Sequence, residues 1–283
     1  MKEKTASKDP LDFTNDKIFK HVLSSDIDVC REFIRRINPE IDTEGIRYAE
    51  TGHEIIVGVK EEKIVRFDIL TRTDRSVTNL EMYRYRPDDF PKTGRYNAAM
   101  IDSELLKNHV PADLADVTVI LLCTYDPLGF GAPVYRIRSK VDGYPEYDYN
   151  EGREICIVTD RGFDKASEEL KPIIWLLTRN EEPIDDPFYR KIQEMVEQAR
   201  TDPEVRREIM LEIEKENAIR RDARKEGHKE GLEEGRKEER CEAVRKFVKK
   251  LRDMNQPEEE ILKTLTDIYP DDEEMIREVM KAE

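Results

Sequence analysis

Hydrophobic positions are spread unevenly along the chain, and their spacing predicts a folded N-terminal part followed by a helical tail. Most of the Ile, Val, Leu, Phe and Tyr residues lie between positions 10 and 180, whereas Glu, Lys and Arg dominate from about position 190 onward. We therefore expect one domain over residues 1–180. A long charged helix with a glycine-rich, low-complexity segment is expected over 181–242, and a small helical module over 243–283.

Periodicity and turn signals predict an α/β order of elements in the first 180 residues. Thr14 or Asn15 caps an expected helix over 16–37, and Asn38–Pro39 ends it. An extended segment is expected over 45–59. The other expected elements are a charged turn at 60–63, hairpin arms at 64–71 and 77–85, turns at 87–94, a helix over 95–109 closed by Pro111, strands at 116–125, 134–138 and 153–159, and a helix over 165–178 with Pro172 near its start or at a kink. This order predicts a mixed sheet flanked by helices.

The tail reads as helix from 187 to 229, and Gly227, Gly231 and Gly235 then recur four residues apart. Such glycines either let two helices approach closely or mark a frayed, solvated segment, and the cost of glycine in a helix favours the second interpretation. Short helices are expected at 243–254, 257–268 and 271–280. A DNA-reading helix-turn-helix is disfavoured because residues 257–283 hold ten acidic and three basic residues, which indicates a protein-protein or dimerisation module instead.

The net charge of −15, with 40% of residues charged, argues against broad attraction to nucleic acid. The acidity is not uniform, however. Residues 66–95 contain seven basic and five acidic residues, so a locally basic groove remains compatible with the sequence.

The cysteine spacing and the N-terminal residues indicate a cytoplasmic protein that does not enter a membrane. The four cysteines are far apart and form no CxxC pair, which is typical of isolated reduced thiols. The opening residues MKEKTASKDP lack the apolar run of a signal peptide, and the longest apolar stretch, over 117–125, is too short to span a bilayer.

The expected hairpin places one carboxylate in each arm. A turn centred between residues 74 and 75 sets Asp68 directly opposite Glu81, with their Cβ atoms about 4.5–5.5 Å apart. Two carboxylates that close repel each other unless a proton or a cation lies between them, and hard oxygen ligands favour Mg²⁺ or Mn²⁺. Such a site suits phosphodiester hydrolysis by metal-activated water. The alternative is a solvated acidic strand face, and a register slip of one residue would separate the two side chains.

Residue 83 shares the strand face of Glu81, where a Lys or Gln would orient water or contact a phosphate, but the chain has tyrosine there. The next residues alternate basic and aromatic, so Arg84 and Arg86 are candidates for a DNA-facing edge, although aromatic strand residues more often lie in a core. The four histidines show no zinc-ligand spacing, and nucleotide-binding and serine-hydrolase motifs are missing from the sequence.

Several segments together resemble the PD-(D/E)XK nuclease-family transposases, also called Rpn-type recombination-promoting nucleases. The matching segments are DFTNDKIFKHVL, RFDIL at 66–70, LEMYR at 80–84, GRYNAAMIDSELLK at 94–107, VTVILLCTYDPLGFGAPVYRIR at 117–138 and the Gly- and Glu-rich tail. They cover most of the chain, and their order and spacing carry the resemblance.

The resemblance implies a restriction-endonuclease-like core that cleaves DNA with Mg²⁺ or Mn²⁺ held by Asp68 and Glu81. Asp16 matches an acidic position of the family's opening motif, which implies a part in holding metal or water. Arg95 and Tyr96 match a family Arg-Tyr pair, for which contact with the DNA backbone and a surface salt bridge with a packing ring are the two interpretations. Relatives carry Gln or Lys where this chain has Tyr83. The leading hypothesis is a DNA endonuclease that oligomerises through its C-terminal helices. The alternative is a catalytically impaired homologue that acts as an oligomeric binding protein.

Overall fold

Two compact units make up the protein in the computed structural model, which describes residues 11–57, 63–106, 110, 114–180, 182–270 and 272–282. The first unit is Met1–Ile209 and the second is Met210–Glu283. The first unit contains every strand, and the second is entirely helical over its described residues.

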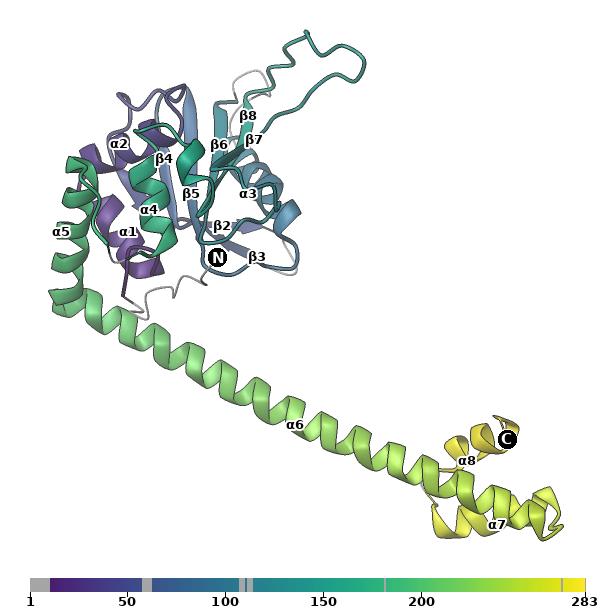
Figure 1. Ribbon diagram of the computed structural model, residues 1–283. Helices are drawn as coiled ribbons and strands as arrows, with labels where there is room; N and C mark the ends of the chain where they lie inside the picture. Colours follow the sequence, from purple (N-terminus) through teal and green to yellow (C-terminus); the bar gives the residue numbers. More distant parts are fainter. Residues whose placement is uncertain are drawn as a thin grey trace. The chain divides into compact units, whose positions relative to one another are not determined.

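The first unit is built on a six-stranded mixed sheet with the strand order β1-β4-β5-β6-β8-β7 (Figure 1). β6 pairs parallel with both β5 and β8, and the other neighbours pair antiparallel. β2 and β3 form a separate two-stranded sheet. The strands are β1 (Ala49–Thr51), β2 (Glu54–Val57), β3 (Lys63–Arg66), β4 (Ile69–Arg72), β5 (Ser76–Tyr83), β6 (Asp116–Cys123), β7 (Val134–Ile137) and β8 (Arg153–Thr159).

Helices cover both faces of this sheet, which confirms the predicted α/β class. Alternate residues of β6 enter different cores: Ile120 and Leu122 face the core that α1, α2, α4 and α5 cover, while Val119 and Leu121 face the core beneath α3. The helices are α1 (Asp16–Ser25), α2 (Ile27–Ile37), α3 (Phe90–Leu105), α4 (Lys171–Thr178), α5 (Pro187–Thr201), α6 (Pro203–Asp253), α7 (Glu258–Ile268) and α8 (Glu273–Ala282).

The β4–β5 hairpin has the register that the sequence predicts. Ile69 pairs with Leu80 and Arg72 with Val77 on either side of a tight turn. Continued by one residue, this register sets Asp68 opposite Glu81. The pairing is fixed because Leu80 is fully buried, and a slip of one residue would turn it away from its core.

The first arm of the hairpin differs from the prediction because it bends at Asp68 instead of running straight over 64–71. The preceding strand bends at the facing position, where Gly52 takes a left-handed conformation with φ of 66°. Across the bend the Gly52 N–H donates to the Asp68 carbonyl at 3.3 Å, and the Phe67 N–H donates to the His53 carbonyl at 2.9 Å. β2 and β3 therefore leave the main sheet as a separate ribbon. Beyond residue 80, β5 loses its partner on the β4 side but stays paired with β6.

The predicted helix over 16–37 is two helices. Asn15 caps the first, as expected, but the Asp26 side chain accepts from the N–H groups of Asp28 and Val29 at 3.0 and 3.2 Å and starts the second. Asn38 follows the last residue of α2, as predicted. An aspartate in extended conformation supplies a new N-cap, so the chain turns there without losing its helical hydrogen bonds.

Helix α3 begins at Phe90, five residues before the predicted start, because Pro91 occupies its first turn, where a missing N–H costs nothing. The segment 90–94 is therefore helical and not a turn. The predicted charged turn at 60–62, His109 and Pro111 lie outside the described residues. Pro172 lies in the first turn of α4, as expected, although that helix starts at Lys171 and not at residue 165.

The predicted helix over 187–229 is interrupted at Asp202, whose carboxylate accepts from Glu204 N–H at 2.7 Å and so starts α6. That helix continues through all three spaced glycines, contrary to the expected fraying. An added Cβ at Gly227, Gly231 or Gly235 would meet no atom of the described residues within 4 Å, so no helix of this chain packs closely there.

The end of α6 packs with α7 and α8 around a small core of its own. The segment 243–254, predicted as a separate short helix, is instead the end of α6, whereas α7 and α8 fall close to the predicted positions. The fully buried or nearly buried residues of this core are Val244, Val248, Ile261, Leu265, Ile276 and Val279. The C-terminal residues thus form a helical module with an independent core.

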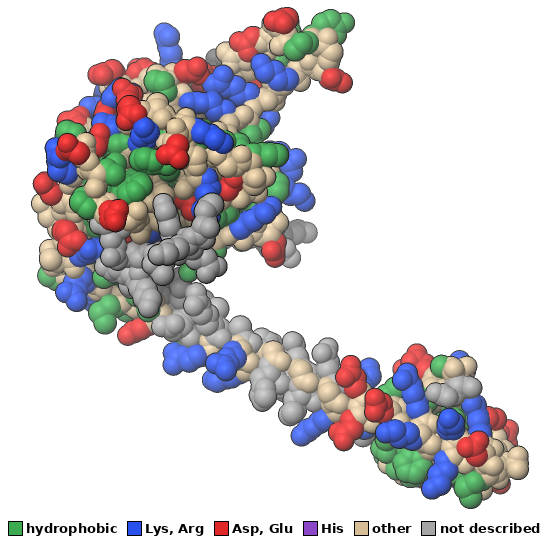
Figure 2. Space-filling view, viewed as in Figure 1, with side chains coloured by type: hydrophobic (Ala, Val, Ile, Leu, Met, Phe, Trp, Pro, Cys, Tyr) green, Lys and Arg blue, Asp and Glu red, His purple; other side chains and the backbone are tan. Residues whose placement is uncertain are grey.

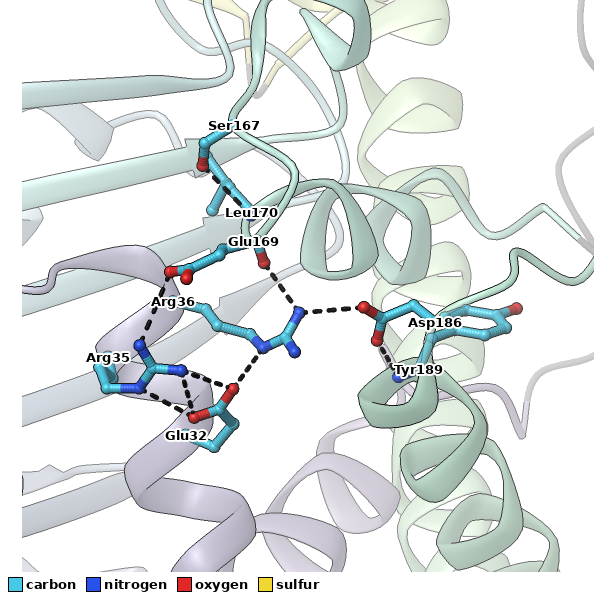
Figure 3. Close-up of polar contacts among 8 residues, drawn as sticks. All are labelled: Glu32, Arg35, Arg36, Ser167, Glu169, Leu170, Asp186 and Tyr189. Atoms are coloured by element: carbon cyan, nitrogen blue, oxygen red, sulfur yellow. Dashed lines mark hydrogen bonds and ion pairs between the residues drawn. The ribbon is translucent and has the colours of Figure 1, made fainter.

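On the α2 side of the sheet, Arg36 ties three elements of the first unit together (Figure 3). Its guanidinium donates to Glu32 Oε1 at 2.7 Å, to the Glu169 carbonyl at 3.2 Å and to Asp186 Oδ2 at 3.3 Å. The guanidinium carbon also lies 4.5 Å from the ring centre of Phe188. Because Asp186 caps α5, Arg36 fixes where α5 starts against α2.

Replacing Arg36 with Met is expected to lower the free energy of unfolding of the first unit by about 2 kcal/mol, because three acceptors lose a charged donor. Arg35→Met is the matched control. Arg35 also pairs with Glu32, but 43% of its side chain is exposed, so a loss below about 0.5 kcal/mol is expected. Trp175, the single tryptophan, lies in α4 and reports urea unfolding of this unit by fluorescence. Equal losses in the two variants would contradict the role of Arg36.

Candidate functional site

Asp68 and Glu81 lie opposite each other at the point where the hairpin bends. The Asp68 N–H donates to Glu81 Oε1 at 3.2 Å, and the Met82 N–H donates to Asp68 Oδ2 at 3.0 Å. Each carboxylate thus accepts a backbone N–H from the opposing segment. The Asp68 side chain takes the place of the backbone acceptor that β5 loses when the first arm turns away.

A buried amide chain holds Glu81 from the other side. Asn79 Nδ2 donates to Glu81 Oε1 at 2.8 Å and to the Ile69 carbonyl at 3.2 Å, and Asn97 on α3 donates to Asn79 Oδ1 at 3.2 Å. Both amides are buried. Glu81 is therefore fixed by β5, by α3 and by the bend, and both of its hydrogen bonds go to Oε1.

Lys20 completes the site, and the sequence reasoning missed it. Its Nζ lies 2.7 Å from Asp68 Oδ1 and 2.7 Å from Asp16 Oδ1, with 15% of the side chain exposed. The resemblance implies that Asp16 helps to hold the metal or water; in the structure one ammonium joins Asp16 to Asp68. The available signal was the Asp16–Lys20 pair, which is spaced i,i+4 beside the apolar stripe of α1.

Burial and mutual repulsion shape the protonation of the two carboxylates. Burial, with a smaller contribution from Asp68, raises the pKa of Glu81 to about 8. Burial and Asp16 also raise the pKa of Asp68, but the Lys20 ammonium opposes this. Burial lowers the pKa of Lys20 less than Asp68 and Asp16 together raise it, so its pKa is above the ordinary value. At neutral pH Lys20 is therefore charged, and Glu81 is the carboxyl that favours its protonated form.

Tyr83 lies two residues beyond Glu81, at the end of β5, and packs its ring edge-on against Phe90 at a centroid distance of 5.8 Å. Burial first, and then the nearby Glu81 and Asp68, raise the pKa of the phenol. It stays neutral and cannot supply the positive charge of a lysine at this position.

The predicted DNA-contacting residues fall into two groups. Arg84 pairs with Asp12 at 3.3 Å and is mostly covered, while Arg86 is exposed; both lie beyond the end of β5 and so do not alternate on a strand as predicted. Arg95 and Tyr96 are exposed on α3 and line a hollow together with Tyr83. The structure thus brings three of the predicted residues together on the α3 side.

A second cleft, of about 350 Å³, gives access to Lys20 from the surface and is also lined by Lys17 and Arg66. Glu208, in the first turns of α6, lies 3.8 Å from Lys17. The three cationic side chains of this cleft share it with the acids Asp202, Glu204 and Glu208, and of the three only Lys20 contacts Asp68.

Asp68 and Glu81 offer the hard oxygen ligands that Mg²⁺ or Mn²⁺ prefers, and Glu81 Oε2 carries no hydrogen bond among the described residues. Over the described ranges no cluster of three or more His, Cys, Asp or Glu side chains has metal-binding geometry. A two-carboxylate set still fits Mg²⁺, which usually keeps several waters and binds through one or two carboxylates.

Comparisons with protein-family models, curated proteins and solved structures gave no match for this chain. In the part of the chain that the structure describes, no helix is both long enough and apolar enough to cross a membrane. The four cysteines are all free.

The protonated state of Glu81 makes stability depend on pH. Its pKa rises from an ordinary value of 4.5 to about 8 on folding, so the stabilising contribution is complete below pH 4.5 and is lost as pH rises toward 8. Glu81→Gln keeps the acceptor and removes the titration. Relative to this variant, the wild-type free energy of unfolding should fall by up to about 1.4 kcal/mol per pH unit in that window. Urea unfolding with chelator at several pH values tests this, and parallel pH profiles would contradict it.

Proposed function

We propose that the protein is a Mg²⁺- or Mn²⁺-dependent DNA endonuclease of the recombination-promoting type, with a restriction-endonuclease-like core. The observation that carries the proposal is the pairing of Asp68 and Glu81 on adjacent segments beside the ammonium of Lys20. Two acids and a lysine that meet at the end of β5 offer the groups that metal-assisted phosphodiester hydrolysis uses. The resemblance of the sequence segments supports the same conclusion.

Each residue has a distinct task in this proposal. Asp68 and Glu81 would hold the cation, and Lys20 would place its positive charge against the scissile phosphate. When bound, the metal would lower the pKa of a water ligand and offset the charge on the phosphoryl oxygens. Lys20 thereby supplies from α1 the charge that Tyr83 does not supply from β5. Lys17 and Arg66 line the cleft through which a phosphate would reach Lys20.

Because Glu81 is protonated at neutral pH, cation binding must release its proton. Affinity for Mn²⁺ should therefore rise as pH increases toward 8. Calorimetry in two buffers of different ionisation enthalpy measures the proton released. At a metal concentration of 100 times the dissociation constant, the wild type gains about 2.7 kcal/mol of stability, and Asp68→Ala or Glu81→Gln gains none.

Plasmid nicking with Mg²⁺ or Mn²⁺ tests the activity directly. Asp68→Ala and Glu81→Ala should abolish cleavage, and Lys20→Met should lower its rate about 10²- to 10³-fold, as for loss of one transition-state contact. Lys191→Met is the matched control. Lys191 also forms an ion pair, with Asp26 at 2.7 Å, but it does not contact Asp68 or Glu81, so this variant should cleave DNA at the wild-type rate. An inactive wild type, or a Lys20→Met enzyme with full activity, would overturn the assignment.

A second candidate function is that of a catalytically impaired homologue that binds DNA or protein as an oligomer. Lys20 favours it, because its ammonium already neutralises Asp68 and Asp16 without a metal. Tyr83 favours it too, since relatives have Gln or Lys there. In this case the wild type does not cut, Mn²⁺ does not stabilise it, and Tyr83→Gln is the variant that gains cleavage.

The free cysteines suit the reducing cytoplasm, which we propose as the location of the protein. We also propose a homo-oligomer formed through the C-terminal helices. Met210, Leu211 and Ile213 on α6 are 60%, 48% and 40% exposed and form an apolar group at the start of the second unit.

Changing Met210, Leu211 and Ile213 together to Gln should convert the oligomer to a monomer, because the apolar area that drives association is removed. Light scattering of the full chain measures the mass. The matched control replaces Phe247, which is 42% exposed on the C-terminal part of α6, with Gln. If the triple variant keeps the wild-type mass, the oligomer does not form through this group.

A further inference from the structure

The hollow beside α3 has the composition of a nucleotide site. Its volume is about 700 Å³, and it is lined by the aromatic rings of Tyr83 and Tyr96, by the cationic side chains of Lys92, Arg95 and Arg153, and by the single acid Asp89. The protein carries a net charge of −15, so a locally cationic hollow with two aromatic rings stands out from the rest of the chain. Figure 2 shows acidic and basic side chains interspersed over the visible face, without a broad basic surface.

The walls of the hollow are fixed by close packing. Gly94 approaches β8 so closely that an added Cβ would lie 2.7 Å from Ile155 Cγ2. This contact holds Arg95 and Tyr96 on α3 near Arg153 on β8. Tyr83 is held against Phe90, and Phe90 in turn contacts Tyr125 at a ring distance of 6.1 Å. A ligand would therefore meet aromatic and cationic groups that are already in position, which lowers the ordering cost of binding.

The hollow adjoins the carboxylate site through one strand. Tyr83 lines the hollow, and Glu81 lies two residues earlier on the same face of β5, which corresponds to about 7 Å along a strand. That separation is close to the span of one nucleotide in an extended chain. Neither carboxylate lines the hollow, and Glu81 is only 7% exposed, so one nucleotide step along β5 is what would separate a base at Tyr83 from a phosphate at Glu81.

We infer that this hollow binds an unpaired nucleotide of single-stranded or locally opened DNA next to the carboxylate pair, an inference that rests on the proposed nuclease function and names its substrate. The aromatic rings would stack on the base, and Lys92, Arg95 and Arg153 would contact the backbone. A duplex keeps its bases stacked inside, so it cannot present a base to such a hollow without opening.

The net charge supports a single strand over a duplex. Sequence-independent attraction to duplex DNA depends on many phosphate contacts with Lys and Arg, which an acidic protein with mixed surface charge does not provide. Stacking is a short-range contact that works with few cations. Tyr83 lacks the charge that a lysine would bring to the carboxylate site, and its side chain is one of the two aromatic rings that line the hollow.

The chain offers a matched control for the two exposed residues. Arg95-Tyr96 on α3 has a counterpart in Arg47-Tyr48, an adjacent Arg-Tyr pair that is also exposed but precedes β1 and does not line the hollow. Tyr96 is 46% exposed and Tyr48 is 58% exposed. Substitution of either pair removes the same chemical groups from the surface.

Binding of the full chain to labelled (dT)12 and to a 12-base-pair hairpin duplex, measured by fluorescence anisotropy in chelator, tests the inference. The wild type should bind (dT)12 at least tenfold more tightly. Tyr96→Ala should weaken (dT)12 binding by about fivefold to 100-fold. Arg95→Ala should weaken it and reduce the slope of log K against log salt by about 0.7. Arg47→Ala and Tyr48→Ala should leave both quantities unchanged.

Duplex preference, or equal losses in the Arg47 and Tyr48 variants, would overturn the inference. Because the chelator prevents cleavage, this result is independent of the activity. If Tyr96→Ala alone loses (dT)12 binding but the wild type never cleaves DNA, the single-strand site stands and the nuclease function is rejected. Nicking by the wild type with normal (dT)12 binding by Tyr96→Ala would retain the nuclease and reject the hollow.

Discussion

The buried pairing of Asp68 with Glu81 is the constraint on which the rest of the first unit depends. Two carboxylates in the interior cannot both stay ionised without a counter-charge. The protein meets this constraint with a proton on Glu81 and the ammonium of Lys20 beside Asp68. Glu81 is hydrogen-bonded to the polar network of Asn79 and Asn97 under α3. The ion pair between Lys20 and Asp68 fixes α1 against the bend. Both faces of the sheet are thus organised around one acidic pair.

The bend at Asp68 explains how the pair can be both structural and chemical. A straight hairpin would cover β5 with backbone hydrogen bonds to its end, whereas the bent one replaces a strand acceptor with a carboxylate. That replacement places an Asp68 oxygen within reach of Lys20 at the end of an interior strand. A neutral Glu81 and a paired Asp68 form a stable resting arrangement, and loss of the Glu81 proton converts it into a two-carboxylate ligand set. In the proposed function, the same residues would serve folding in one protonation state and metal binding in the other.

Local pattern was enough to predict the register but not the partners of the site. The tight turn and the period of two fix which residues face each other, so the opposition of Asp68 and Glu81 followed from a short stretch of sequence. Lys20 lies on a helix that meets the hairpin only in the folded chain. Its position beside an apolar stripe is common for lysines, so the sequence pattern did not indicate its contact with Asp68. The bends at Asp26 and Asp68 were missed because a single aspartate can continue an element or cap the next one, and tertiary packing decides which.

Tyr83 belongs both to the surroundings of the carboxylate pair and to the hollow beside α3. As a substitute for Lys or Gln it removes a charge from beside Glu81, which on its own indicates a weakened enzyme. Lys20 on α1 places its positive charge beside Asp68, so the carboxylate pair has a cationic neighbour. The phenol ring meanwhile forms a wall of the hollow that Arg95 and Tyr96 also line. Under the proposed function, position 83 would serve shape and stacking, and the positive charge beside the carboxylates would come from Lys20 on α1.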